Sequence, residues 1–233
     1  MMNKKIAVFA KTPGLSPIKT RLAKTIGEVN ALDLYKLSLD AVLENVKISI
    51  TEKEKRFIAI GEELGANDYF WDKYRDDFTL IWTGSGGLGD RLSNVYTSLY
   101  SPEFEVCITG SDSPHIMAED LQELIDYKFT GPQTVLFGPS VDGGFYFFKS
   151  NKPIPSEIWT EITYSQNDTL QQIMKNLNKN HISVAQGSPA IDIDDYETLK
   201  ISIREIESNS QSTISQNNLA NWFRSHANLA LQR

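Results

Sequence analysis

The segment EVCITGSDSP, residues 105–114, decides how the rest of the chain can fold. It opens on a mostly apolar run that includes the β-branched Val106 and Ile108, as is typical of a strand covered on both faces by helices. Pro114 stiffens the turn after this run, so Asp112 should project from the carboxyl edge of a sheet. Buried strands of this kind belong to parallel sheets, so the segment predicts an α/β protein.

Other short apolar runs alternate with longer helical patterns on both sides of this segment. The expected strands are residues 6–10, 56–60, 79–82, 105–109, 134–137, 145–148 and 182–185. The expected helices, where apolar residues recur at three- and four-residue spacing, are residues 31–46, 90–100, 118–127, 167–178 and 195–206. The chain is therefore expected to form one domain over residues 1–207.

Residues 208–233 are expected to be a polar linker and a short C-terminal helix. Residues 208–218 are rich in Ser, Asn and Gln, which is typical of a loose linker. Leu219, Trp222 and Phe223 then supply an apolar stripe for a helix. This helix would dock either on its own domain or on a second copy of the chain in a homodimer.

Composition excludes several classes of function. The net charge of −7 over 233 residues argues against nucleic acid as the main partner, whereas a small anionic ligand needs only a local basic cluster. The single cysteine, Cys107, rules out a disulfide framework and a cysteine-rich zinc site, and its apolar neighbours indicate a buried, inert thiol. No run is long enough for a signal peptide or a membrane helix, so we expect a cytoplasmic protein without a membrane partner.

A basic loop, KTPGLSPIKTRL, follows the first expected strand at residues 11–22. In α/β sheets ligands gather beyond the carboxyl ends of strands, and Lys11, Lys19 and Arg21 could offset the charge of a polyphosphate there. The loop is not a P-loop, because Ile18 stands where that motif needs Gly before its Lys. The alternative is an exposed basic loop that leads into a helix.

A glycine-rich turn, TGSGGLGDRL, follows the third expected strand at residues 83–92. Gly84, Gly86 and Gly89 match the dinucleotide pattern G-x-G-x-x-G, and Asp112 could then be the carboxylate that binds a ribose. In a transferase, the glycines would instead let the backbone close over a base or ribose. Asp90 and Arg91 would begin a helix whose N–H groups face the ligand. Asp90 could also be no more than an N-cap.

Asp112 has two distant acidic candidates as partners. A carboxylate at a strand end suits Mg²⁺, which is usually held by one or two carboxylates together with substrate phosphates. Asp192 and Asp194 alternate with isoleucines, so in extended chain both would face one side. Asp194 and Glu197 also resemble a capping box, and this competing role ranks Asp192 ahead of Asp194 as a metal ligand.

A third turn, GPSVDGG at residues 138–144, lies between two expected strands. Its Asp-Gly pair is typical of a hairpin. The functional alternative is an acceptor-binding wall made by Asp142, Gly143 and Gly144, in which Asp142 binds a hydroxyl or acts as a base.

Six motifs in this order resemble a bacterial domain-of-unknown-function family, family 2064, of the nucleotide-diphospho-sugar transferase superfamily with the GT-A fold. Its relatives include the molybdenum-cofactor and phospholactate guanylyltransferases. The motifs are FAKTP, KTRL, GLGDR, GSDSP, GPSVDGG and DID, beginning at residues 9, 19, 87, 110, 138 and 192. The chain departs from the family at Ser113 and Tyr164, where Cys and Trp are usual.

The resemblance implies a three-layer α/β/α sandwich with a mixed central sheet, and Mg²⁺ or Mn²⁺ held by Asp112, Asp192 and Asp194. It places the basic loop on the phosphates. The residues expected to bind the nucleotide are Lys11, Thr12, Lys19, Arg21, Gly87, Gly89, Asp90, Arg91 and Ser111.

The expected function is metal-dependent group transfer from a nucleotide donor to a small acceptor, with Lys19, Arg21 and Asp142 as the catalytic residues. The reaction would be nucleotidyl transfer from an NTP or glycosyl transfer from an NDP-sugar. Two alternatives stay open: an NAD(P)-binding oxidoreductase that uses the glycine-rich turn, and a nucleotide-binding module without activity.

Overall fold

The computed structural model describes residues 3–131 and 133–226. The strands are β1 (Asn3–Ala10), β2 (Arg56–Ile60), β3 (Thr79–Trp82), β4 (Phe104–Thr109), β5 (Gln133–Pro139), β6 (Phe145–Ser150) and β7 (Ser183–Gln186). The helices are α1 (Thr20–Ile26), α2 (Glu28–Ser49), α3 (Leu88–Leu99), α4 (Ala118–Asp126), α5 (Glu157–Thr160), α6 (Thr169–Lys179), α7 (Tyr196–Ser208) and α8 (Ile214–Ser225). Three short 3₁₀ helices, Lys53–Lys55, Gly65–Asn67 and Tyr69–Tyr74, flank β2.

The strands form one mixed sheet in the order β3-β2-β1-β4-β6-β5-β7. β1 to β4 are parallel, β6 pairs antiparallel with both β4 and β5, and β7 is parallel to β5. Consequently the carboxyl ends of β1, β4 and β5 lie at one edge of the sheet. The chain leaves β1 towards β2 and returns on its other side as β4, so β1 and β4 form the switch point where α/β sheets bind ligands.

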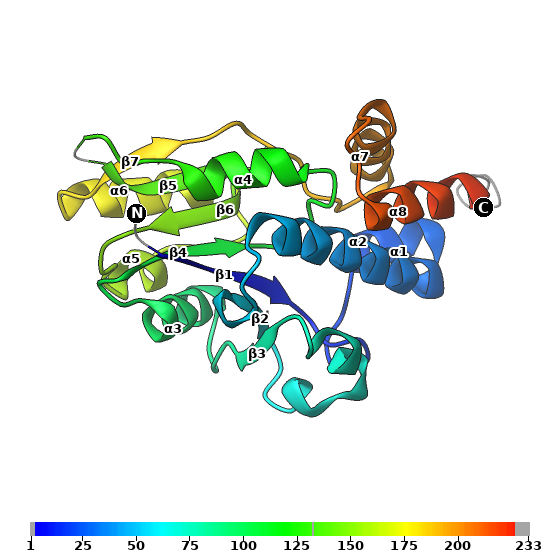
Figure 1. Cartoon of the computed structure of the whole chain (residues 1–233), viewed down its shortest axis with the longest axis horizontal. Helices are drawn as coiled ribbons and strands as arrows, with labels where there is room; N and C mark the ends of the chain where they lie inside the picture. The colour runs from blue at the N-terminus through cyan, green and yellow to red at the C-terminus, as the bar shows by residue number, and fades with distance from the viewer. Residues whose placement is uncertain (1–2, 132, 227–233) are drawn as a thin grey trace.

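Alternating side chains of the strands pack against two separate layers of helices, one on each face of the sheet, which gives the α/β/α sandwich. Ile6 and Val8 pack with α2 and α4 on one face, whereas Ala7 packs with α3, α5 and α6 on the other. Figure 1 shows the sheet between these two groups of helices. Cys107 lies in the first core, so the predicted burial of its thiol is confirmed, and burial raises the pKa of that thiol to about 12.

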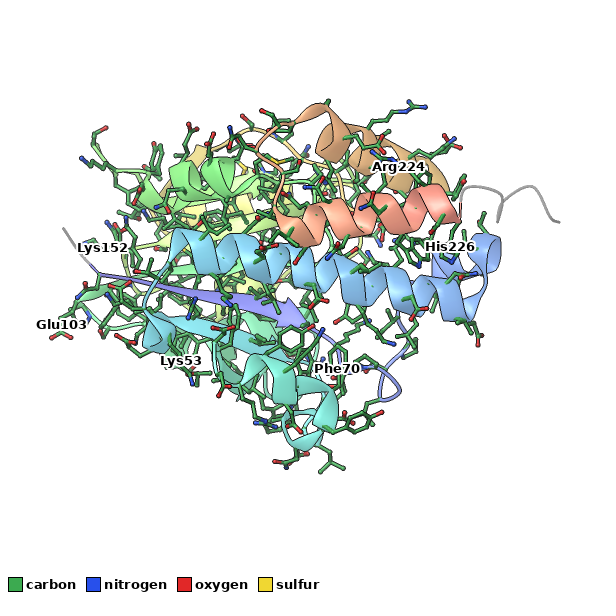
Figure 2. All side chains as sticks on the ribbon, turned by 45° about the vertical axis from the view of Figure 1, so that its right-hand side comes forward. Lys53, Phe70, Glu103, Lys152, Arg224 and His226 are labelled. Carbon is green, nitrogen blue, oxygen red and sulfur yellow. The ribbon has the colours of Figure 1, made fainter. Side chains whose placement is uncertain are left out.

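The helix α8 packs on its own chain. In Figures 1 and 2 it lies alongside α2. Leu219 and Ala220 are buried in a third apolar cluster with residues of α1, α2 and α7. Gln216 donates hydrogen bonds to the carbonyls of Pro114 and Ile116, so α8 also supports the turn after β4.

All seven expected strands and all five expected helices are present, with ends shifted by a few residues. The expected linker over residues 208–218 is wrong in its length, because α8 already begins at Ile214. Thr213 and Gln216 cap each other there, which starts the helix inside the polar run. Within the described residues no helix is both long enough and apolar enough to cross a membrane.

Candidate functional site

Asp112 lies at the switch point, and Lys19 meets it there. The Lys19 ammonium is 2.6 Å from Asp112 Oδ1, and its side chain is only 5% exposed. Lys19 also donates a hydrogen bond to the carbonyl of Ile193, whose own N–H donates to the Asp112 carbonyl at 2.9 Å. One ammonium therefore ties the loop after β1 to both the turn after β4 and the segment before α7.

The backbone at Lys19 is unusual and positions the next cation. Lys19 is the N-cap of α1 and has a left-handed backbone with φ 47°, which few residues other than Gly, Asn and Asp adopt. Arg21 stands in the first turn of α1 and forms an ion pair with Asp194 at 3.0 Å. Two predicted cations thus meet two predicted acids across the edge of the sheet.

Tyr35 of α2 holds the start of the basic loop. Its hydroxyl donates to the carbonyl of Lys11 at 2.7 Å and accepts from the N–H of the same residue at 2.8 Å. Burial is the main reason that the pKa of Tyr35 is raised, so the phenol stays neutral and can both donate and accept. This pair of bonds fixes the direction in which the chain leaves β1.

Asp192 is held by two hydroxyls. Its carboxylate accepts hydrogen bonds from Ser113 at 2.5 Å and from Ser140 at 2.6 Å. Burial raises the pKa of this carboxyl, the two hydroxyls lower it, and the charges of Asp112 and Asp142 raise it further. Asp192 therefore links the turns after β4 and β5.

Asp194 does not cap α7, although the sequence left that role open for it. The N-cap of α7 is Asp195, which accepts from the N–H of Thr198, so the predicted Asp194–Glu197 capping box is wrong by one residue. Asp194 instead faces Arg21 and is half-buried; burial raises its pKa, while Lys19 and Arg21 lower it. The reason for ranking Asp192 ahead of Asp194 as a metal ligand is thereby removed.

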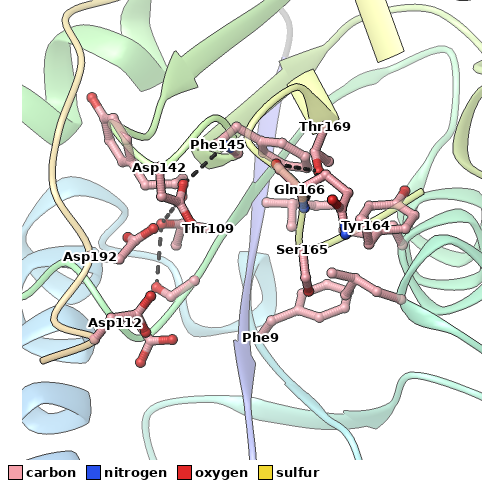
Figure 3. Close-up of a pocket in the computed structure, with 17 residues that line it drawn as sticks. Phe9, Thr109, Asp112, Asp142, Phe145, Tyr164, Ser165, Gln166, Thr169 and Asp192 are labelled. Carbon is pink, nitrogen blue, oxygen red and sulfur yellow. Dashed lines mark hydrogen bonds between the residues drawn. The ribbon is translucent and has the colours of Figure 1, made fainter. Parts of the chain in front are cut away.

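Two cavities meet at Asp112. The basic cavity, about 470 Å³, is lined by Lys11, Lys19, Arg21 and Arg91, together with Tyr35 and Ser111. The acidic cavity, about 320 Å³, is lined by Asp142 and Asp192 together with Tyr164, Ser165 and Gln166. Both are bounded by Phe9, Leu88, Gly110, Asp112 and Asp194. Figure 3 shows Asp112, Asp142 and Asp192 on one side of the acidic cavity and Tyr164 and Ser165 on the other.

The expected nucleotide-binding residues divide into two groups. Lys11, Lys19, Arg21, Arg91 and Ser111 line the basic cavity. The others have packing or capping contacts instead. Thr12 is fully buried and accepts a hydrogen bond from the Trp71 indole. Asp90 accepts from the N–H of Gly87, the N-cap of α3.

The glycine-rich turn does not have the geometry of a dinucleotide site. In that fingerprint the acidic residue lies at the end of the next strand in the chain, and this strand pairs directly with the strand before the glycines. Here β2 and β1 lie between β3 and β4, so Asp112 is three strands away from the turn. Gly89 has a packing reason, because a Cβ there would lie 2.2 Å from the carbonyl oxygen of Trp159.

The third turn is the predicted hairpin, and it also reaches the site. β5 and β6 pair antiparallel around it, and Asp142 and Gly144 line the acidic cavity. Asp142 accepts from the N–H of Gly144 at 3.0 Å. Gly143 has φ +94°, and a Cβ there would lie 2.0 Å from the carbonyl oxygen of Asn167, so only glycine fits.

The donor set suits a divalent cation that brings further ligands with it. Among the described residues no group of three His, Cys, Asp or Glu side chains is arranged to hold a metal by itself. Four carboxylates nevertheless border the acidic cavity, and only Asp112 and Asp194 have cationic partners. Mg²⁺ accepts such a site, since it is often bound by one or two carboxylates plus substrate phosphates.

Two residues of the site carry no sequence signal. Tyr35 has the pattern of a core residue of a helix, yet its hydroxyl holds the start of the basic loop. Ser165 adopts φ 59° at the rim of the acidic cavity, and no pattern in the sequence marks it.

The bacterial family described as "Uncharacterized protein conserved in bacteria (DUF2064)" matches residues 46–166, just over half of the chain. No curated protein matches the chain.

Among solved structures, a "putative nucleotide-diphospho-sugar transferase" from Desulfovibrio desulfuricans G20 is 20% identical, with a TM-score of 0.81 over 100% of this chain and 98% of that one. A cytidylyltransferase from Leptospira borgpetersenii is 13% identical, with a TM-score of 0.57 over 100% and 98%. A CMP:2-keto-3-deoxy-manno-octonic acid synthetase complexed with CTP is 13% identical, with a TM-score of 0.50 over 89% and 100%. These likenesses show that the chain has the fold of this group, as the sequence predicts.

Proposed function

The chain belongs to the bacterial family DUF2064, and from this premise and the geometry at Asp112 we propose that it is a nucleotide-dependent transferase, most simply a nucleotidyltransferase. The observation that carries the proposal is that a cavity lined by four cations and a cavity lined without a basic side chain meet at the carboxylates of Asp112 and Asp194. A donor and an acceptor that are held in separate cavities with a common border have their reacting atoms brought together, which removes much of the entropic cost of reaction.

The basic cavity suits the triphosphate of a donor. Lys11, Lys19 and Arg21 come from the loop after β1 and the start of α1, Arg91 comes from the start of α3, and all four line one cavity. Four cations exceed what a single phosphate needs and fit a polyphosphate, part of which must leave. The structures of similar fold include a cytidylyltransferase and a synthetase complexed with CTP, which supports a nucleotide as the donor.

In the proposed reaction an acceptor hydroxyl attacks the α-phosphorus of the donor. An O–P bond forms, the bond between the α-phosphorus and the bridging oxygen breaks, and its electron pair leaves with pyrophosphate. Lys19 and Arg21 stabilise the charge of the leaving group, and Asp142 accepts the proton of the attacking hydroxyl. Asp112 and Asp194 would hold a divalent cation, which when bound polarises phosphate oxygens and replaces Lys19 and Arg21 as the partner of these carboxylates.

Glycosyl transfer from an NDP-sugar is the second candidate. It is favoured by the likeness over the whole of this chain to the structure described as a "putative nucleotide-diphospho-sugar transferase". The same two cavities would serve, but the bond that breaks would join the sugar carbon to the diphosphate. The released product would then be a nucleoside diphosphate in place of pyrophosphate.

A panel of ligands tests the proposal. The unfolding temperature of the full chain is measured with NTPs, NDP-sugars, NADH and NADPH, each with and without Mg²⁺ or Mn²⁺. We expect NTPs with metal to stabilise the protein most. Stabilisation by NADH without metal, and by no NTP or NDP-sugar, would overturn the proposal. Release of pyrophosphate or of nucleoside diphosphate then separates the two transfer reactions.

A matched pair of variants tests the metal-binding role of Asp112. Asp112 and Asp33 have side chains that are each 47% exposed, and each is paired with a lysine, but Asp33 lies on α2 away from both cavities. Asp112→Ala should abolish the metal-dependent part of donor binding, whereas Asp33→Ala should keep it. Equal retention in both variants would remove Asp112 from the proposed role.

A further inference from the structure

The acidic cavity is lined without a basic side chain. Its seventeen lining residues, all within the described part of the chain, include four aspartates and no Lys, Arg or His. Asp112 and Asp194 are neutralised locally by Lys19 and Arg21, which stand on the side of the basic cavity. The charge that remains on the acceptor side is therefore that of the two other carboxylates.

Asp142 and Asp192 have no ion-pair partner among the described residues. Asp192 is held by the hydroxyls of Ser113 and Ser140, and Asp142 by the N–H of Gly144. An ionised carboxylate only accepts hydrogen bonds, so any ligand group that binds here must donate. Hydroxyl and amino groups do so, whereas a phosphate or carboxylate would place like charges side by side, which disfavours binding.

The opposite wall of the cavity is apolar and aromatic. Phe9, Phe145 and Tyr164 line it, and the Tyr164 hydroxyl donates to the carbonyl of Trp159, which fixes the ring. In Figure 3 Tyr164 and Ser165 lie across the cavity from Asp142 and Asp192. A flat ligand with an apolar face and hydroxyls at its edge would match both walls.

We propose that the acceptor is a small polyhydroxylated ring compound, neutral or amino-substituted, and that the acidic cavity rejects phosphorylated and carboxylated acceptors. The proposal rests on the proposed function, since it takes the basic cavity as the donor site. Hydroxyl or amino groups of the acceptor donate hydrogen bonds to Asp142 and Asp192, and its ring lies against Phe9 and Tyr164. A nucleoside triphosphate stays on the other side of Asp112, so the two ligands are sorted by charge.

The test uses matched sets of one ring: a hexose, its 2-amino derivative and its 6-phosphate, and the same three forms of a cyclitol. Each is added to the full chain already saturated with NTP and Mg²⁺, and binding is measured by calorimetry. We expect the neutral or amino form to bind at least ~10-fold more tightly than the phosphate of the same ring. Tighter or equal binding of a phosphate overturns the proposal, and so does failure of every neutral and amino form to bind.

Failure of the proposed function is recognised separately, because the protein would then not bind the NTP in the first step. A charge variant adds a second measurement. Asp142→Lys should improve the binding of the phosphorylated form relative to the neutral form by at least ~10-fold. Asp168→Lys is the control, since Asp168 lies in the neighbouring loop outside the cavity lining and should leave the ratio unchanged. An equal change of the ratio in both variants overturns the proposal.

Discussion

The basic and acidic cavities share Asp112 as a border but differ in how their charges are satisfied. On the basic side, Lys19 and Arg21 stand within 3.0 Å of Asp112 and Asp194, so cation meets anion directly. On the acidic side, hydroxyls and an N–H hold Asp142 and Asp192. Hydrogen bonds stabilise a carboxylate without cancelling its charge. The acceptor side therefore keeps carboxylates without a cationic partner, whereas the two carboxylates that both cavities share are paired with cations of the donor side.

The supports of the two cavities also differ. The start of the basic loop is held by side chains that bond its backbone: the Tyr35 phenol bonds Lys11, and Glu62 accepts from the N–H of Thr12. The acidic segment before α7 is held through that helix, where Ser202 contacts Nδ1 of the buried His115 and Glu205 stands 3.5 Å from Nε2. The basic side should thus respond to local changes in the loop, and the acidic side to changes in the packing of α7.

Replacing the ammonium that joins the two sides should have the largest effect. Lys19→Met keeps a side chain of similar length but removes the charge that faces Asp112 and the carbonyl of Ile193. We expect turnover to fall by about 10²–10³-fold, as for the loss of one group that stabilises a developing charge. Pyrophosphate release under saturating donor measures it.

The control for Lys19→Met is Lys55→Met. Lys55 is also mostly buried and paired, with Glu52, but it precedes β2 at the opposite edge of the sheet. A similar loss of turnover in both variants would mean that the effect is one of folding and would break the distinction between the two sides.

Acidification should lower the stability of the chain through His115, which packs against α7 on the acidic side. Burial lowers the pKa of His115 to about 4 in the folded chain, against about 6.5 when unfolded. Because the folded value is the lower one, stability is full above pH 6.5 and is lost as the pH falls from 6.5 through 4. The loss from this residue is at most roughly 3 kcal/mol. His115→Gln should remove that part of the pH dependence, as measured by urea unfolding at pH 7 and pH 4.5.

His181→Asn serves as the comparison for this test, because it removes an exposed imidazole that lies outside α7 and the turn after β4. The same loss of stability on acidification in wild type and His115→Gln would show that His115 is not the group that titrates.

The sequence predicted the sheet because each strand is a short apolar run bounded by turn residues. It missed α1, which starts after a left-handed Lys19 with no side-chain cap, and α5, which has four residues and no periodicity to detect. The short 3₁₀ helices around residues 65–74 carry no pattern either. Elements that follow from periodicity could be predicted, and elements that follow from tertiary packing could not.

The same distinction applies to the residues of the site: some could be predicted from the sequence, and others depend on tertiary packing. Lys19 and Asp112 could be placed together from strand ends alone, since parallel strands bring their following loops to one edge. The choice between Asp194 and Asp195 as the cap of α7 could not be made, because both residues are aspartates and differ by one position. Tyr35 was hidden because a buried tyrosine in a helix has the same pattern whether or not its hydroxyl holds a loop.

Two glycines with similar φ angles, one in the basic loop and one on the acidic side, separate the effect of backbone strain from that of steric collision. Gly14 has φ +85° and open space around it, whereas Gly143 has φ +94° and a carbonyl 2.0 Å from where a Cβ would be. Gly14→Ala should cost about 1 kcal/mol from strain alone, and Gly143→Ala about 2–3 kcal/mol. Chemical unfolding measures both. Gly143→Ala should also weaken acceptor binding and leave donor binding intact, and equal stabilities would contradict the packing of Asn167 on the turn.

Removing one oxygen from Tyr35 should give the smallest effect and affect only the basic side. Tyr35→Phe deletes both bonds to Lys11 while keeping the ring that packs under β1. Donor binding should weaken by about tenfold, corresponding to one or two hydrogen bonds of about 1 kcal/mol, because Lys11 is no longer held in place. Acceptor binding to the donor-saturated chain should not change. Tyr74→Phe is the matched control. The Tyr74 phenol donates a hydrogen bond to Asp40, which lies on α2 as Tyr35 does, and Tyr74 lines neither cavity. If Tyr35→Phe weakened both ligands equally, the loop after β1 would support the acidic side as well, and the two sides would not be held independently.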